Sequence, residues 1–222
     1  PKLLVQYKFD GDTKASNSGL LDLISSGISY TTDKEGNVGK AAMFSGLYSS
    51  YALSDYSSAF NLDEFTYSFW LNPSQNFGVD YNDYIDFISR WGNWGVGNQS
   101  FAFSLSKLGS LKLMFYNQIN SQKDHPNNYT MINTADNIKP NQWTHIAISF
   151  NSLNSAKVYI NGNNILSIQS VKPQYSTIYG ICIGKRYDDY QNSYYKGAID
   201  DLKIFKKALT DNEIKFVFNS KI

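Results

Sequence analysis

The 222-residue sequence has one cysteine, Cys182, so no disulfide can form within the chain. Charge is scarce and balanced, because 20 basic and 19 acidic residues leave a net charge of +1. A nucleic-acid-binding domain needs a basic surface, which this composition does not provide. The sequence also lacks an apolar run of about 18–20 residues, the length that spans a bilayer. We therefore expect neither nucleic-acid binding nor membrane insertion.

Aromatic residues are abundant, with 17 Tyr, 14 Phe and 4 Trp. Several segments alternate apolar and polar residues with the period of two that is typical of a β-strand with one buried face. The dipeptide Asn161-Gly162 accepts the positive φ angles of a tight hairpin turn. The pattern predicts strands at 3–9, 65–72, 100–106, 111–116, 143–150, 178–184 and 197–205, two more within 156–168, and weaker candidates at 41–44 and 84–89.

One helix is predicted, close to the C-terminus. Thr210 is a good N-cap, and Glu213 stands three residues later, which makes a capping box. About ten strands without crossover helices indicate antiparallel sheets and hence an all-β sandwich. Because no repeat and no Pro/Gly/Ser-rich linker divides the chain, we predict a single domain over residues 1–222, excised from a larger protein.

The order of these segments resembles a known family. In sequence, "YKFDGD", "GKAAMFSG", "FTYSFWLNP", "QWTHIAISFN", "KVYINGN", "ICIGKR" and "YKGAIDDLKIFKKALTDNEI" are similar to segments of laminin-G-like, or concanavalin A-like lectin/glucanase, domains over about residues 3–218. Some of them also look like the lectin-like half of the clostridial neurotoxin receptor-binding region. The resemblance implies a two-sheet antiparallel jelly roll whose first and last strands pair, here 3–9 with 198–205.

The resemblance also implies a structural Ca²⁺ ion, which many members of the family hold near the joined terminal strands. Calcium takes six to eight oxygen ligands, several of them anionic. This chain has "SNSG" where the family loop often has D-x-S-G, so one carboxylate is missing. The candidate ligands are Asp10, Asn17 and Asp200, with Asp12 or carbonyl groups near Ser45.

The adjacent carboxylates Asp200 and Asp201 interrupt an apolar run, and the sequence alone leaves their role open. Either the pair holds a metal ion or a backbone loop, or it marks a bulge in the strand. We expect Asp201 to face solvent or to pair with a lysine.

Recognisable catalytic machinery is not found in the sequence. Glycosidases need two carboxylates about 5–9 Å apart, and the laminarinase-type enzymes of the family carry a Glu-x-Asp-x-x-Glu run. The three glutamates, Glu35, Glu64 and Glu213, form no such run. His125 and His145 have no neighbouring ligand set for zinc. We therefore expect a protein that is not an enzyme.

Two loop regions, 80–98 and 186–196, carry aromatic residues that strand periodicity does not require. Carbohydrate recognition needs an aromatic plane against the C–H face of the sugar, flanked by Asp, Asn or Arg to bond its hydroxyls. The alternative is that these aromatic residues only cap the sandwich edge. The candidate ligand-binding residues are Tyr84, Arg90, Trp91, Trp94, Arg186, Tyr187, Asp188, Tyr190 and Asn192.

These features favour a non-catalytic, lectin-like module of a secreted or cell-surface protein, which attaches that protein to a glycan or polysaccharide. One alternative is a protein–protein adhesion or spacer module of a larger extracellular protein or toxin, with a protein receptor as its partner. A second alternative is a hydrolase with an unfamiliar pair of aspartates, involving Asp188 or Asp189.

Overall fold

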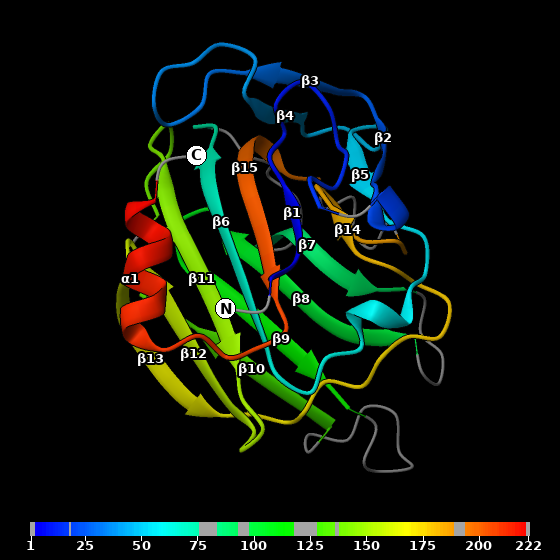
Figure 1. Cartoon of the computed structure of the whole chain (residues 1–222), viewed down its shortest axis with the longest axis vertical. Coiled ribbons are helices and arrows are strands. Elements are labelled where there is room, and N and C mark those ends of the chain that lie inside the picture. The colour runs from blue at the N-terminus through cyan, green and yellow to red at the C-terminus, as the bar shows by residue number, and fades with distance from the viewer. Residues whose placement is uncertain are drawn as a thin grey trace.

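The computed structural model describes residues 3–17, 19–75, 84–92, 98–117, 128–135, 138–188 and 194–220. Within these ranges two antiparallel sheets lie face to face, and one α-helix follows the last strand (Figure 1). The predicted jelly-roll sandwich with a short C-terminal helix is confirmed. In the described part of the chain, no helix has the length and apolar character needed to cross a membrane.

Sheet A contains eight strands, and its last strand in the chain pairs with the first. This pairing confirms what the family resemblance implied. Across the sheet the order is β13 (Asn163–Gln169), β12 (Ser155–Ile160), β11 (Thr144–Phe150), β6 (Phe65–Pro73), β15 (Lys196–Phe205), β4 (Ala41–Ser45) and β3 (Ile28–Thr31), with β1 (Leu3–Tyr7) also paired to β15.

Sheet B contains seven strands and supplies the second layer. Two single-turn 3-10 helices, η1 (Gly19–Leu21) and η2 (Ser58–Phe60), lie in the connections. The strand order is β10 (Tyr129–Asn133), β9 (Leu111–Tyr116), β8 (Gln99–Ser106), β7 (Tyr84–Trp91), β14 (Cys182–Ile183), β5 (Tyr51–Leu53) and β2 (Ile24–Ser26).

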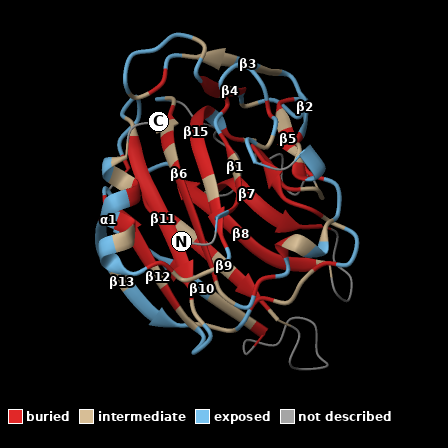
Figure 2. Ribbon diagram, in the orientation of Figure 1, coloured by how far each residue is buried: buried red, intermediate tan, exposed pale blue. Residues whose placement is uncertain are grey.

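Aromatic side chains fill the space between the sheets. The Phe101 ring is stacked on Phe103, with 4.8 Å between centroids, and packs edge-to-face with Tyr67, with 5.3 Å between centroids. Each such ring stabilises the fold by about 1.5–3 kcal/mol through burial. Figure 2 shows that the central strands of both sheets are buried along most of their length. The two sheets are therefore a rigid frame for the side chains on their outer faces.

Helix α1 (Asp211–Asn219) packs on the outer face of sheet A. Its buried residues Ile214 and Val217 contact Ala147 of β11 and Tyr159 of β12. The predicted capping box is confirmed, because the Thr210 side chain accepts a hydrogen bond from the backbone N–H of Glu213 and the reverse bond is also present. The helix therefore covers part of the outer face of sheet A (Figure 1).

The carboxylate pair in β15 marks a bulge, one of the two alternatives left open by the sequence. The register with β6 shifts between Asp200 and Lys203, and at the same point the other partner of β15 changes from β4 to β1. Asp201 adopts a left-handed φ of 47°. Its carboxylate accepts hydrogen bonds from Lys203 Nζ at 2.5 Å and Gln6 Nε2 at 2.6 Å, so the expected pairing with a lysine is confirmed.

Candidate ligand-binding site

The outer face of sheet B carries aromatic and charged side chains that alternate with core residues. Phe101 and Phe103 of β8 point into the core, so Ala102 and Ser104 face outward. The register places outward-facing neighbours from β7 and β9 beside them. We call this surface the Trp91 face, and it comprises Tyr84, Asp86, Trp91, Ala102, Ser104, Lys112, Met114, Tyr116 and Arg186.

Trp91 and Arg186 meet on this face, where β7 ends. The Arg186 guanidinium lies 5.2 Å from the centroid of the Trp91 ring, a cation–π distance. The same ring packs edge-to-face with Tyr116, at 5.9 Å between centroids, and is 1% exposed. Trp91 ends β7, whereas Arg186 follows β14 almost a hundred residues later. The fold therefore brings together one member of each of the two loop regions predicted from the sequence.

Two carboxylates hold the Arg186 guanidinium in place. Asp188 Oδ1 accepts from Arg186 Nε at 2.9 Å and Asp188 Oδ2 from Nη2 at 2.5 Å, a bidentate pair. Asp86 Oδ2 lies 3.8 Å from Arg186 Nε, and Asp86 also accepts a hydrogen bond from the Ser104 hydroxyl. Burial raises the pKa of Asp86, while Arg186 and Ser104 act against that rise. The guanidinium is thus fixed in orientation before any ligand arrives.

Tyr84 lines a hollow at the end of the Trp91 face. This hollow has a volume of about 360 Å³ and includes the β8–β9 turn. Lys112 Nζ lies 4.7 Å from the centroid of the half-buried Tyr84 ring. An aromatic ring beside hydroxyl and ammonium donors is a combination of side chains that can bind a sugar. The lining residues are Tyr84, Ser106, Lys107, Leu108 and Ser110.

Arg90 does not join this face. It lies opposite Phe101, on the core side of β7, and its side chain is fully buried. Its guanidinium donates to the carbonyl oxygens of Tyr179 at 3.0 Å, Ser176 at 3.0 Å and Phe60 at 3.2 Å. Burial lowers the pKa of Arg90. These contacts tie two connecting segments to β7 and give Arg90 a structural role.

Tyr187 also turns away from the Trp91 face. Its hydroxyl donates to the carbonyl oxygen of Ser54 at 2.7 Å, and its ring centroid lies 4.9 Å from that of Tyr179. Burial raises the pKa of the Tyr187 hydroxyl. The other predicted ligand-binding residues, Trp94, Tyr190 and Asn192, lie outside the described residues.

Asp86, Ser104, Lys112 and Tyr116 were not predicted from the sequence. Each alternates with a core residue on its strand, which is a signal that periodicity carries. That signal does not reveal which outward-facing residues share a neighbourhood, because the sheet register decides it.

Asp200 is the one predicted calcium ligand that is both buried and incompletely bonded. Its Oδ1 accepts the N–H of Asp201 at 2.8 Å, whereas its Oδ2 has no hydrogen-bond partner among the described residues. Burial, followed by the charges of Asp201, Asp33 and Asp10, raises the pKa of Asp200 to about 8. A buried, unbonded carboxylate oxygen among other acids fits a cation.

The other predicted calcium ligands are engaged elsewhere or exposed. Asn17 Oδ1 accepts the N–H of Gln6 and Asn17 Nδ2 donates to a backbone carbonyl of β1, so both polar atoms of its amide are already bonded to β1. Asp10 lies 3.7 Å from Lys40 Nζ, Asp12 accepts a backbone N–H of its own turn, and Ser45 is exposed. Across the described residues, no three His, Cys, Asp or Glu side chains gather closely enough to hold a metal ion.

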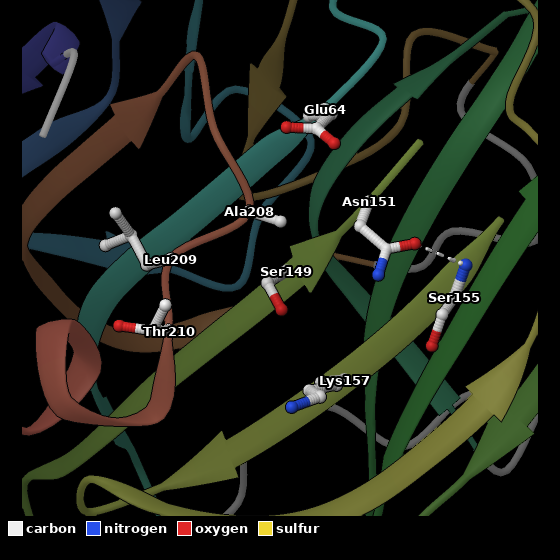
Figure 3. Close-up of a pocket in the computed structure, with 8 residues that line it drawn as sticks. All are labelled: Glu64, Ser149, Asn151, Ser155, Lys157, Ala208, Leu209 and Thr210. Atoms are coloured by element: carbon white, nitrogen blue, oxygen red, sulfur yellow. Dashed lines mark hydrogen bonds between the residues drawn. The ribbon is translucent and has the colours of Figure 1, made fainter. Parts of the chain in front are cut away.

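A second hollow, of about 240 Å³, lies over sheet A beside the segment that leads into α1 (Figure 3). Asn151 Oδ1 accepts the N–H of Ser155 at 3.1 Å, and Lys157 Nζ pairs with Asp211 at 3.2 Å. Its lining residues include no aromatic ring, so it offers no stacking platform for a sugar. They are Glu64, Ser149, Asn151, Ser155, Lys157, Ala208, Leu209 and Thr210.

The chain is similar in sequence to parts of two larger proteins. It is 28% identical to Paraclostridial mosquitocidal protein 1 of Paraclostridium bifermentans over 160 residues, which are 71% of this chain and 12% of that protein. It is 34% identical to human Adhesion G-protein coupled receptor D1 over 85 residues, which are 36% of this chain and 9% of the receptor. The chain therefore matches only about a tenth of the length of these curated relatives.

Solved structures share the fold over nearly the whole chain. The binding domain of Paraclostridial mosquitocidal protein 1 has a TM-score of 0.77 at 19% identity, covering 98% of this chain and 52% of that one. Domain 4 of AbnA, an extracellular arabinanase from Geobacillus stearothermophilus, in complex with arabinotriose, has a TM-score of 0.69 at 22% identity and covers 98% of both chains.

The ligand-binding domain of botulinum neurotoxin serotype D, in complex with N-acetylneuraminic acid, has a TM-score of 0.69 at 16% identity, covering 98% of this chain and 50% of that one. The family model for the concanavalin A-like lectin/glucanases superfamily matches residues 45–215, well over half of the sequence. The chain therefore belongs to the concanavalin A-like lectin/glucanases superfamily.

Proposed function

We propose that this chain is a non-catalytic carbohydrate-binding module that attaches a larger secreted or cell-surface protein to a glycan. The observation that carries this proposal is the meeting of β7 and the segment after β14 on the Trp91 face. There an aromatic ring, a fixed guanidinium and two carboxylates lie together. Such a combination is chemically suited to a sugar, because charged groups bond its hydroxyls and a ring packs against its C–H groups. Trp91 is 1% exposed, so the ring of this face that a sugar can reach is the half-buried Tyr84.

The hollow at Tyr84 supports the same function. Its volume of about 360 Å³ falls in the range of small-molecule sites, about 300–1,000 Å³. The half-buried Tyr84 ring, with Lys112 Nζ 4.7 Å from its centroid, lies at the edge of the face, where a glycan chain can extend. The arabinotriose and N-acetylneuraminic acid complexes of two structural relatives also favour a carbohydrate ligand.

The arrangement of the carboxylates favours binding over hydrolysis. A glycosidase needs one free carboxylic acid and one free carboxylate on either side of the scissile bond. Asp188 is held bidentately by Arg186, and Asp86 shares the same guanidinium. We therefore expect no turnover of chromogenic glycosides. Hydrolysis that disappears in an Asp188→Asn variant would establish a hydrolase instead.

Glycan-array screening followed by titration calorimetry tests the proposed function. We expect dissociation constants in the micromolar to millimolar range, about −8 to −4 kcal/mol. Tyr84→Ala should weaken binding about tenfold, because it removes a stacking ring. Tyr30→Ala, at a half-buried tyrosine of β3 in the other sheet, is the matched control and should bind normally. Capture of a protein receptor without any glycan binding would favour the adhesion alternative.

We also propose that Asp200 binds a structural Ca²⁺ ion, with Asp10 and loop carbonyls as further ligands. The support is the buried Oδ2 of Asp200, which the described residues leave without a hydrogen bond. When bound, the ion would neutralise the acids around the junction of β1, β4 and β15.

Melting curves in calcium and in chelator test this site. Calcium should raise the melting temperature of the wild type and leave that of Asp200→Asn unchanged. In chelator, at a pH above the raised Asp200 pKa of about 8, the variant should be the more stable protein, because it no longer buries a carboxylate. Asp63→Asn, at an exposed acid, should respond to calcium as the wild type does. Superimposable wild-type curves in both buffers would count against the ion.

A further inference from the structure

The first two residues of β8, Gln99 and Ser100, lie at a β-bulge. Arg90 of β7 is opposite Phe101, but the next residue, Trp91, is opposite Gln99. Ser100 is therefore the extra residue on β8. Bulges re-aim side chains and occur often beside functional sites. Since directly opposed residues lie side by side, the register places Gln99 beside Trp91.

Both side chains are buried without satisfying their polar atoms. Gln99 is 1% exposed and Ser100 is fully buried. Among the described residues, no hydrogen-bond partner is found for the amide oxygen of Gln99, its amide nitrogen or the Ser100 hydroxyl. Nearly all buried polar groups in proteins are bonded, because leaving them unbonded destabilises the fold. An apolar pair of similar size would avoid this cost, so packing alone does not account for the two residues.

The unbonded atoms match the chemistry of a sugar. An amide offers an acceptor and a donor side by side, and a serine hydroxyl offers both functions on one atom. Two adjacent sugar hydroxyls can donate to the amide oxygen and accept from the amide nitrogen, and each can also bond a serine hydroxyl. The rings of Trp91 and Tyr116 lie next to this position and supply an apolar surface for the sugar's C–H groups.

We propose that Gln99 and Ser100 form a subsite that binds two adjacent hydroxyl groups of one sugar residue on the Trp91 face. This inference deepens the proposed carbohydrate-binding function and rests on it. The two side chains are closed to water, so a ligand must displace the atoms that cover them. We therefore expect association to be slower than at a ready-formed site, because binding requires a conformational change.

Two substitutions separate a binding role from a structural one. Gln99→Met keeps the length of the side chain and removes both polar atoms, and Ser100→Ala removes a single oxygen. We expect each variant to melt at or above the wild-type temperature and to lose at least tenfold in glycan affinity. Ser68→Ala is the matched control in sheet A, because the Ser68 hydroxyl bonds His145 at 2.9 Å. That control should melt lower and bind the glycan normally.

The outcomes distinguish this inference from the proposed function. If the wild type binds a glycan and Tyr84→Ala weakens that binding, but Gln99→Met and Ser100→Ala bind as the wild type does, the function stands and the subsite is refuted. A lower melting temperature with unchanged affinity would mean that an internal water bonds these atoms, which also refutes the subsite. If the wild type binds no glycan at millimolar concentration, both ideas fail. Should Gln99→Met not fold, Ser100→Ala decides.

Discussion

Acidification from pH 7.5 to pH 5 should remove a stabilising contribution that the buried, neutral His145 makes. The side chain projects from β11, is 1% exposed, and is enclosed by the rings of Trp70 and Phe218 at 5.3 and 5.5 Å. Its Nε2 lies 2.9 Å from Ser68 Oγ, and its Nδ1 has no hydrogen-bond partner within the described residues. Burial, followed by two nearby lysine ammonium groups, lowers the pKa of His145 from 6.5 to about 3.

The size of the effect follows from the difference between the two pKa values. In the unfolded chain the imidazole takes a proton near pH 6.5, whereas in the folded protein it stays neutral down to about pH 3. Between these values the unfolded state binds more protons, so the free energy of unfolding falls as the pH falls. The slope is about 1.4 kcal/mol per pH unit, so the loss from pH 6.5 to pH 5 is about 2 kcal/mol. Above pH 6.5 the contribution is fully present.

Urea unfolding of the wild type and of His145→Gln at several pH values isolates this contribution. The variant has no imidazole to protonate. The difference in free energy of unfolding between the wild type and the variant should therefore change by about 2 kcal/mol between pH 7.5 and pH 5. Asp200, whose raised pKa gives a slope of opposite sign, affects both proteins equally and cancels. A difference between the two proteins that stays constant over this range would refute the reasoning.

Three further substitutions, one of them paired with a compensating variant, probe the stability of the fold. Arg90→Met should lower the free energy of unfolding by about 3–5 kcal/mol, because it leaves three carbonyls without donors; a denaturant midpoint close to the wild type would contradict its structural role. Thr210→Ala should cost about 1 kcal/mol by removing the helix cap, and an unchanged midpoint would count against the capping box. Gly92→Ala should cost about 1–3 kcal/mol, since the new Cβ overlaps the Tyr179 ring, and Tyr179→Leu should relieve that loss in thermal melts.

The long central strands were predicted correctly because each has one face in the core. Residues 111–116 are an instance, where the predicted and observed strands coincide. The hairpin at Asn161-Gly162 was also predicted, and both residues have positive φ, 49° and 77°. The strands Ile24–Ser26, Ile28–Thr31 and Tyr129–Asn133 were missed, because their side chains are mostly exposed or half-buried and show no clear apolar face. Within 178–184, only Cys182–Ile183 forms a strand.

The residue types of the candidate site could be predicted from the sequence, but not which individual residues lie together in it. The two arginines stand in similar aromatic surroundings in the sequence, and nothing local separates them. Their difference is one of sheet face, because Arg90 is opposite Phe101 on the core side, whereas Arg186 lies over Trp91 on the outer side. Similarly, Asp86 acquires its role only when the register places Ser104 opposite it. Register depends on contacts between distant segments, so sequence patterns do not carry it.

The two buried aspartates Asp86 and Asp200 show how the same physical cause leads to different roles. Burial raises the pKa of both carboxyls. Asp86 is compensated by Arg186 and a serine hydroxyl, so its charge serves to orient a guanidinium on the Trp91 face. Asp200 has one backbone N–H and no compensating cation among the described residues. Calcium should therefore raise the melting temperature without changing glycan affinity, whereas Arg186→Met should lower affinity at any calcium concentration. Glycan binding that depends on calcium would show that the two sites are coupled and would contradict this separation.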